Sequence, residues 1–171
     1  MRQMEKDGLI QKSLSEWASP VMMVAKHDGA RRMVCDLRKV NAVLRGENFD
    51  TMTLREIVEK VGGTKSKVFS LIDLRAAYNQ IVVDKESRKF IAFVCPLGSY
   101  EFKRLPFGLR SSGSIFNYII SLALSSDEIL CRNVITYIDD LFIFTDTVEQ
   151  HIDVMRRLFV ALRAANLKNS Q

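Results

Sequence analysis

The chain has 171 residues, of which 47% are hydrophobic and 26% are charged, and it carries a formal net charge of +5. These values are typical of a folded domain, and three Pro and eight Gly argue against a long disordered segment. No apolar run reaches the roughly 20 residues of a membrane helix, so no membrane partner is expected. Three widely spaced cysteines favour neither a disulfide framework nor a zinc site, and the positive charge fits a polyanionic partner or merely a basic surface.

The first half of the chain predicts a β-hairpin followed by a short helix. Residues 20–26 and 31–38 are β-prone, and Asp28-Gly29 between them offers the Gly that a tight turn needs. Thr53 and Glu56 form a capping box, which predicts that a helix begins there. The apolar stripe of this helix consists of Leu54, Ile57, Val58 and Val61.

Several strands and a helix follow in the middle of the chain. Residues 68–72 predict a buried strand, and residues 91–94 and 100–102 predict two more strands joined by a loop. Residues 115–123 carry apolar side chains at helical spacing. Residues 134–144 are strongly β-prone and are interrupted once, by two aspartates.

The last predicted element is a long amphipathic helix, with a second capping box formed by Thr147 and Gln150. Strands and helices occur without a regular βαβ alternation, which favours an α+β fold in which helices back an antiparallel sheet. The sequence has no phosphate-binding Gly-rich loop of the dinucleotide or nucleoside-triphosphatase type. The apolar residues that make this last helix amphipathic are Val148, Ile152, Met155, Phe159 and Leu162.

Asp139 and Asp140 are adjacent carboxylates between two apolar, β-prone segments. A purely structural hairpin favours Asn-Gly or Asp-Gly at its tip, because Gly tolerates positive φ and two carboxylates repel each other. A divalent cation would neutralise that repulsion. The alternative is a solvated turn that happens to be acidic.

Asp73 comes directly after the strand predicted at residues 68–72. An Asp in this place is most often a turn residue or a helix cap. Together with Asp139 and Asp140, it would form a cluster of three carboxylates if the strand end and the hairpin tip lie side by side. Such oxygen ligands suit Mg²⁺ or Mn²⁺, and two ions can stabilise the attacking and leaving oxygens of a phosphoryl displacement. The carboxylates therefore make metal-dependent nucleotidyl transfer a reasonable prediction.

Five blocks of the sequence, in order, resemble motifs of reverse transcriptases. Residues 137–140 (Tyr-Ile-Asp-Asp) resemble the Tyr-x-Asp-Asp signature, and residues 72–81 resemble the block with the first catalytic Asp. Residues 105–109 (Leu-Pro-Phe-Gly-Leu) resemble the segment near the incoming nucleotide, whereas residues 17–21 and 35–41 resemble the fingers of the gypsy-type retrotransposon group. The resemblance covers nearly the whole chain and implies the reverse transcriptase domain of a gypsy-type LTR retrotransposon Pol polyprotein.

The resemblance also implies a fold and subdomains. It implies an α+β polymerase palm, an antiparallel sheet backed by helices, with a fingers β-hairpin subdomain and without a thumb. The chain, residues 1–171, would be a fragment of the domain. Fingers would occupy about 1–66 and 78–105, intermixed with palm at about 67–77 and 106–171.

The family's catalytic residues carry over onto three positions. Asp73, Asp139 and Asp140 would be catalytic and, with the carbonyl of Leu74, would hold two Mg²⁺ ions, for which Mn²⁺ can substitute. The residues implied to bind the nucleotide are Lys26, Arg32, Leu74, Ala76, Ala77, Tyr78 and Phe107.

Chemistry agrees with several of the implied nucleotide contacts. Lys26 and Arg32 would grip the triphosphate, since Lys offers a point charge and Arg a fork for phosphate. Ala76 and Ala77 would lie under the triphosphate with their backbone N–H groups, and Phe107 would pack beside the nucleotide. Tyr78 would be the steric gate beneath the sugar. Judged by their types alone, the basic residues would be solvated side chains and the tyrosine a core aromatic.

Two further features concern the fingers and the following helix. Asp36 and Arg38 are expected to form a structural ion pair in the fingers. After the Leu-Pro-Phe-Gly-Leu block the family usually has Ala-Pro, whereas this chain has Arg110-Ser111-Ser112-Gly113-Ser114, which predicts a looser start of the next helix.

The implied function is RNA-directed DNA polymerisation with a primer on an RNA or DNA template and deoxynucleoside triphosphates. Other Pol polyprotein domains would be partners in the parent protein, within a cytoplasmic virus-like particle. One alternative is a non-catalytic retroelement relic that at most binds nucleic acid. Another is an RNA-templated RNA polymerase, against which Tyr78 at the sugar position argues.

Overall fold

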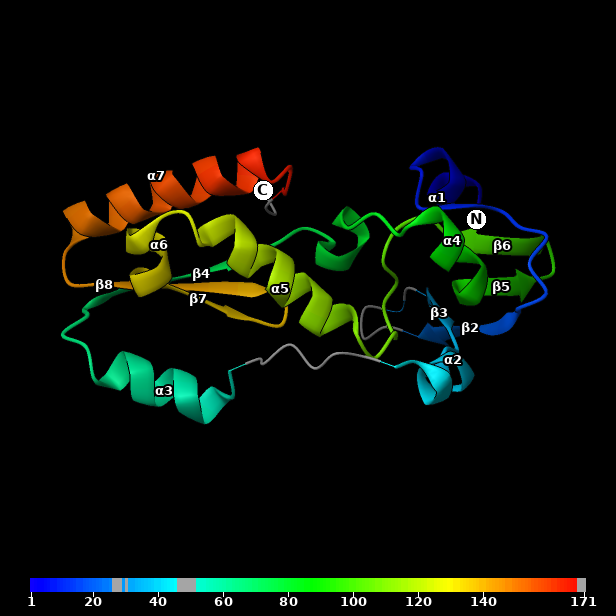
Figure 1. The fold of residues 1–171 in the computed structure, drawn as a ribbon, viewed down its shortest axis with the longest axis horizontal. Coiled ribbons are helices and arrows are strands. Elements are labelled where there is room, and N and C mark those ends of the chain that lie inside the picture. Colours follow the sequence, from blue (N-terminus) through cyan, green and yellow to red (C-terminus); the bar gives the residue numbers. More distant parts are fainter. Residues whose placement is uncertain (26–28, 30, 46–51, 169–171) are drawn as a thin grey trace. The chain divides into compact units, whose positions relative to one another are not determined.

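The computed structural model of the chain describes residues 1–25, 29, 31–45 and 52–168. The chain divides into two compact units, called unit 1 (Met1–Glu47 and Tyr78–Ser112) and unit 2 (Asn48–Ala77 and Gly113–Gln171). Each unit contains both strands and helices, so the predicted α+β fold is confirmed (Figure 1). The fingers and palm boundaries are assignments by function, and they stay a prediction.

Unit 1 is built on a five-stranded sheet with the strand order β1-β6-β5-β2-β3. Neighbouring strands are antiparallel except for β2 and β5, which pair in parallel. The strands are β1 (Ile10–Lys12), β2 (Ser19–Ala25), β3 (Arg31–Cys35), β5 (Ala92–Cys95) and β6 (Gly98–Phe102).

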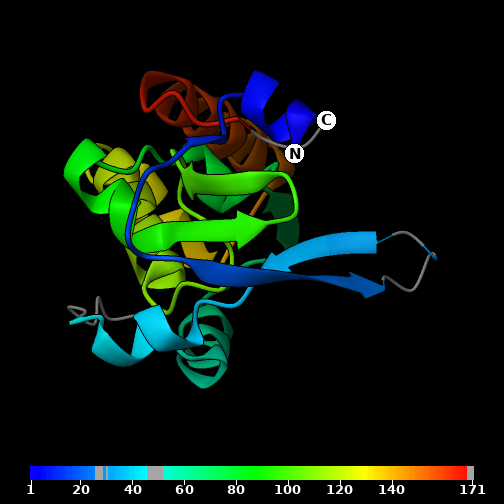
Figure 2. The same cartoon turned by 90° about the vertical axis from the view of Figure 1, so that its right-hand side faces the viewer.

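The predicted hairpin of residues 20–38 is present as β2 and β3, which pair with Met23 opposite Met33 (Figure 2). The tight turn predicted between them falls on residues 26–28 and 30, which lie outside the described residues, as does the predicted triphosphate ligand Lys26. The strands predicted at residues 91–94 and 100–102 are confirmed as β5 and β6.

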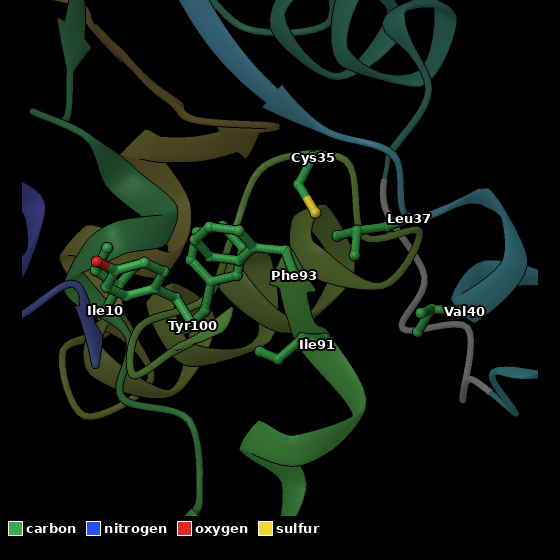
Figure 3. Close-up of a cluster of buried hydrophobic side chains, with 8 residues drawn as sticks. Ile10, Cys35, Leu37, Val40, Ile91, Phe93 and Tyr100 are labelled. Atoms are coloured by element: carbon green, nitrogen blue, oxygen red, sulfur yellow. The ribbon is translucent and has the colours of Figure 1, made fainter. Parts of the chain in front are cut away.

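The core of unit 1 is an apolar cluster between the sheet and its short helices (Figure 3). Phe93 lies at its centre with no exposed surface, and its ring contacts those of Tyr100 and Phe102. Alternate residues of β6 point inward, as expected for a strand with one buried face. The short helices of this region are α1 (Arg2–Lys6), α2 (Arg38–Val43), η1 (Ala77–Gln80), α4 (Lys85–Arg88) and η2 (Lys89–Ile91).

Unit 2 is built on a three-stranded antiparallel sheet with the order β4-β8-β7. Its strands are β4 (Val68–Asp73), β7 (Val134–Tyr137) and β8 (Asp140–Thr145), so all three predicted strands are present. The prediction that β4 is buried is wrong, because Phe69 and Leu71 are 49% and 66% exposed. Exposed and partly buried residues alternate along β4, so packing covers one face of the strand and leaves the face with Phe69 and Leu71 largely open.

Helices lie on both sides of the unit 2 sheet. The helix α7 (Val148–Ala164) lies on one side of the strands and α3 (Leu54–Gly62) lies on the other, in both views (Figures 1 and 2). The predicted capping box of α3 is complete, with Thr53 and Glu56 each accepting a backbone N–H of the other. The remaining helices are α5 (Ser112–Leu124) and α6 (Glu128–Asn133), and none of the described helices is long and apolar enough to cross a membrane.

The predicted amphipathic helix is present as α7, but its buried face differs from the apolar residues that indicated it. Only Leu162 is buried; Val148, Ile152 and Phe159 are exposed, and Met155 is partly buried. The buried face also contains His151, which an apolar stripe does not include, so the face is rotated by about one residue. Its members are His151, Val154, Leu158 and Leu162.

The predicted capping box of α7 is half present. Thr147 Oγ1 accepts the backbone N–H of Gln150, but the Gln150 side chain accepts the backbone N–H of Asp146 and not that of Thr147. The helix therefore begins at the predicted place with a different second hydrogen bond.

Candidate functional site

The three predicted catalytic carboxylates belong to one end of the unit 2 sheet. Asp73 is the last residue of β4 and Asp140 is the first residue of β8, and the two are direct partners in the antiparallel ladder. Asp139 lies in the turn between β7 and β8, next to Asp140. Backbone pairing therefore brings a strand end and a hairpin tip together, although the residues are 66 and 67 positions apart in the sequence.

The turn that presents Asp139 holds a strained residue. Ile138 has a φ of 59°, in the left-handed region, and its side chain is 44% exposed. A β-branched residue rarely adopts this conformation, which costs roughly 1–2 kcal/mol relative to right-handed backbone. The turn contains Ile138 and Asp139, and β8 begins at the next residue, Asp140. The strained backbone of Ile138 therefore lies beside the carboxylates.

Electrostatics at this end of the sheet are unfavourable in the absence of a cation. Burial, then the carboxylates of Asp139 and Asp73, raise the pKa of Asp140 above its ordinary value. The donor set of three carboxylates thus fits a hard divalent cation, which would offset their mutual repulsion. The fit concerns the type of donor and not its arrangement. Within the described ranges, no three His, Cys, Asp or Glu side chains form a group arranged to hold a metal ion.

The segment that follows Asp73 contains three of the predicted nucleotide-binding positions. Leu74 and Ala77 are buried, whereas Ala76 is exposed and has a φ of 48°. A left-handed residue within a turn is a conformation from which successive backbone N–H groups can converge on an anion. The conformation of Ala76 is therefore compatible with a phosphate contact through the backbone.

In unit 1, three other predicted residues form one cluster. The Arg32 guanidinium lies 4.8 Å from the centre of the Phe107 ring, and the Tyr78 ring meets the same ring edge-on at 5.0 Å. Tyr78 is buried, whereas Phe107 is 41% exposed and Arg32 is exposed. The cluster combines a cation and an aromatic surface, which suits a ligand with both phosphate and a flat ring.

Arg32 and Phe107 of this cluster line a hollow of about 530 Å³ in unit 1. Asn79 and Cys35 also line it. Burial, then the nearby Asp36 carboxylate, raise the pKa of Cys35 to about 11, so this thiol stays neutral near pH 7 and is a poor nucleophile or metal ligand. Asn79 was not singled out by the sequence analysis, although it lies in the same block as Tyr78.

The loop that carries Phe107 is clamped to α2. Asn41 donates its side-chain amide to the carbonyl of Gly108 and accepts the backbone N–H of Arg110. The Arg110 guanidinium donates to the carbonyl of Leu44. Arg110, the first residue of the segment that departs from the family pattern, therefore anchors this loop together with Asn41. The sequence analysis missed this role of Asn41 and Arg110.

Two further predictions concern the ion pair of Asp36 with Arg38 and the start of α5. Arg38 and Asp36 form a bidentate ion pair with 2.6 and 2.8 Å contacts, as expected, and hydrogen bonds from Arg38 lower the pKa of Asp36 to about 2. The helix after the departure, α5, begins at Ser112, whose buried hydroxyl donates to the carbonyl of Pro106. Ser112 thus ties the start of this helix to the preceding loop.

The family described as reverse transcriptase (RNA-dependent DNA polymerase) matches residues 24–171. The chain is 33% identical to the retrovirus-related Pol polyprotein from transposon 297 of Drosophila melanogaster, over 98% of this chain and 16% of that protein. It is 31% identical to the transposon Tf2-3 polyprotein of Schizosaccharomyces pombe, over 95% of this chain and 12% of that protein.

Solved structures agree with this assignment. The chain matches the prototype foamy virus protease-reverse transcriptase with a TM-score of 0.86 and 25% identity, over 99% of this chain and 22% of that chain. It matches the foamy viral enzyme in complex with an RNA/DNA hybrid equally well. The chain thus spans less than a quarter of these relatives. Because the family matches most of the sequence and the fold matches a solved reverse transcriptase, the chain belongs to the reverse transcriptase family and corresponds to the reverse transcriptase domain of transposon Pol polyproteins.

Proposed function

We propose that this domain performs template-directed nucleotidyl transfer by a two-metal mechanism as part of a longer polyprotein. The primer 3′-hydroxyl attacks the α-phosphate of a deoxynucleoside triphosphate, a new P–O bond forms, and the bond to pyrophosphate breaks. The hydroxyl proton is lost to solvent or to a nearby base. The observation that carries this proposal is the pairing of Asp73 with Asp140 beside Asp139 at one end of the unit 2 sheet.

Asp73, Asp139 and Asp140 would hold two divalent cations, together with the carbonyl of Leu74. Bound Mg²⁺ or Mn²⁺ supplies positive charge to the phosphate oxygens and to the attacking and leaving oxygens. The three carboxylates suit this role because they are hard anionic donors from two adjacent strands and the turn next to them. Burial, and then the carboxylates of Asp139 and Asp73, raise the pKa of Asp140, which supports a site that gains stability when a cation is present.

Each unit contributes residues with chemistry suited to a nucleotide. Arg32, with Lys26, would bind the triphosphate through charge-assisted hydrogen bonds. The backbone N–H groups of Ala76 and Ala77 would contact a phosphate, Phe107 would pack against the nucleotide, and buried Tyr78 would limit the space for a 2′-hydroxyl. The contacts of Phe107 with Arg32 and Tyr78 support a shared role for these three side chains.

A primer–template is the proposed macromolecular partner. The foamy viral relatives were solved with double-stranded DNA and with an RNA/DNA hybrid, which supports the same class of ligand for this domain. The net charge of +5 favours binding to a polyanion and makes that binding weaker at high salt. The other domains of the parent polyprotein are expected to contribute to this binding.

The first test is Mn²⁺ binding by calorimetry, followed by extension of a DNA primer on an RNA template. Asp139→Asn and Asp73→Asn are each expected to lower Mn²⁺ affinity by more than about 100-fold, since even outer-shell changes cost 10–100-fold. Asp146→Asn is the matched control, because Asp146 follows the opposite end of β8 and is exposed. Its affinity for Mn²⁺ should equal that of the wild type.

Two outcomes would contradict the proposal. Equal Mn²⁺ affinity in the wild type and in Asp139→Asn would show that the carboxylates do not act together. Binding of primer–template without extension at any Mg²⁺ or Mn²⁺ concentration, in a protein that includes the neighbouring domains, would favour the non-catalytic alternative.

A further inference from the structure

A buried chain of hydrogen bonds crosses the interior of unit 2. His151 on α7 lies 2.8 Å from Thr145 Oγ1 through Nδ1 and 2.8 Å from Ser70 Oγ through Nε2. Thr145 is fully buried and His151 is 5% exposed. Thr145 Oγ1 also donates to the carbonyl of Thr147 at 3.2 Å. One imidazole therefore connects β4, β8 and α7.

One assignment of the protons satisfies the whole chain of hydrogen bonds. With the Thr145 hydroxyl donating to the carbonyl of Thr147, Thr145 Oγ1 can accept from Nδ1–H of His151, and Nε2 can accept from the Ser70 hydroxyl. Each ring nitrogen and each hydroxyl proton is thereby satisfied, which a buried polar group requires if it is not to destabilise the fold.

The two hydroxyls occupy diagonal positions on one face of the sheet. Ser70 pairs with Ile143, and Thr145 is two residues further along β8 on the same side. Diagonal neighbours are about 7–8 Å apart, a separation that an imidazole with a hydrogen bond at each end can span. His151 therefore fixes how far β4 is shifted along β8.

This shift decides where the carboxylates lie. Ser70 is three residues before Asp73, or about 10 Å along β4. A one-residue slip of β4 would move Asp73 away from Asp140 and turn its side chain to the other face. Because β8 is the one strand that pairs with β4 in the part of the chain that the structure describes, no second ladder fixes the register of β4, and the His151 bridge adds to the first.

We propose that His151, through Ser70 and Thr145, is a positioning residue that holds β4 in register with β8 and so keeps Asp73 opposite Asp140. The inference rests on the proposed function, since it concerns the same carboxylates. His151 does not touch the reacting atoms; it acts through the two strands. This role requires the hydroxyl groups of Thr145 and Ser70. An apolar residue of the same volume at either position would fill the space without a hydrogen bond to hold the strand.

The test compares variants that differ by one hydroxyl. Thr145→Val keeps the side-chain volume and removes the hydrogen bonds, whereas Thr145→Ser keeps the hydroxyl. We expect Thr145→Val to lower Mn²⁺ affinity and the kcat of primer extension by about fivefold, with the KM for the nucleotide unchanged. Thr145→Ser should restore both values. Ser70→Ala should act like Thr145→Val, and the double variant should be no worse than either, because both hydroxyls are needed for one bridge.

A control separates positioning from a general loss of stability. Val154→Ala removes volume from the same buried face of α7 without touching a hydrogen bond of the network. Urea titration gives the stability of each variant, and Mn²⁺ affinity is measured where all are folded. Equal loss of affinity in Val154→Ala and Thr145→Val at matched stability would overturn the inference, as would additive effects in the double variant.

Different experimental results would overturn the positioning role of His151 and the proposed function. If the wild type binds Mn²⁺ and Asp139→Asn does not, but Thr145→Val binds as the wild type does, only the positioning role is overturned. If the wild type binds no Mn²⁺, the proposed function fails and the positioning role is overturned with it.

Discussion

In unit 1 the candidate nucleotide-binding side chains are held by contacts between rings, whereas in unit 2 the carboxylates are held by backbone register. Arg32 and Tyr78 both meet the Phe107 ring, and the loop of Phe107 is clamped by hydrogen bonds to α2. Asp73 and Asp140 instead face each other because β4 and β8 pair. A substitution can thus disturb the first group through side-chain packing and the second through the strands themselves.

The interiors of the two units also differ in the kind of contact that holds their side chains. The main core cluster of unit 1 is apolar and is centred on Phe93. The interior of unit 2 contains the hydrogen-bonded Ser70, Thr145 and His151 in addition to apolar side chains. Apolar packing tolerates small shifts, whereas a hydrogen-bond network requires defined positions, which suits a site that depends on register.

The largest predicted effect concerns the core of unit 1. Phe93→Ala should lower the free energy of unfolding by about 3–5 kcal/mol, because it leaves a cavity beside Tyr100 and Phe102. Phe90→Ala is the matched control: this ring is 42% exposed, and its edge contact with Trp17 is worth about 1 kcal/mol. Urea denaturation measures both. Equal losses would mean that unit 1 is not stabilised by the apolar cluster.

A smaller effect is expected at the turn that carries Asp139. Ile138→Gly should raise the free energy of unfolding by up to about 1 kcal/mol, since the left-handed penalty of roughly 1–2 kcal/mol exceeds the entropic cost of Gly. Ile129→Gly, at a similarly exposed Ile in α6, should lower it by about 0.5–1 kcal/mol. Thermal unfolding distinguishes the two, and a loss in both variants would show that Ile138 is not strained.

The smallest effect is a pH dependence at Asp140. Because the folded pKa is raised above the unfolded value, the folded state binds more protons between the two values, and stability falls as pH rises through this window. Without divalent cations, Asp140→Asn should therefore be more stable than the wild type at neutral pH. The difference should shrink as the pH is lowered below the raised pKa. Melting temperatures measured without divalent cations across this range test the sign, and a difference that grows on acidification would contradict it.

Local features of the sequence were predicted well. The capping box of Thr53 and Glu56 and the positions of β4, β7 and β8 depend on neighbouring residues, and the structure confirms them. The aspartates were identified from their unusual places at a strand end and in a hairpin. Their pairing also matches expectation, because an antiparallel ladder of β4 and β8 brings these places together.

Burial was predicted less well. Apolar residues predicted a buried strand at β4, and four of the five apolar residues that indicated α7 are not buried. Both differences have one cause: an apolar side chain shows that a face can be buried, but a neighbouring element decides whether it is. His151 was overlooked for the same reason, since a polar residue on a buried face is recognisable only from its partners.

The sequence by itself determined the family, the mixed α+β class, the helix caps and the identity of the three carboxylates, because each depends on residue types at short spacing or on ordered motifs. Only the tertiary structure decided that Asp73 faces Asp140, that Arg32, Tyr78 and Phe107 share one cluster, and that His151 connects β4 with β8. These relations join residues that are tens of positions apart, and their geometry follows from strand pairing and helix packing, which local periodicity does not encode.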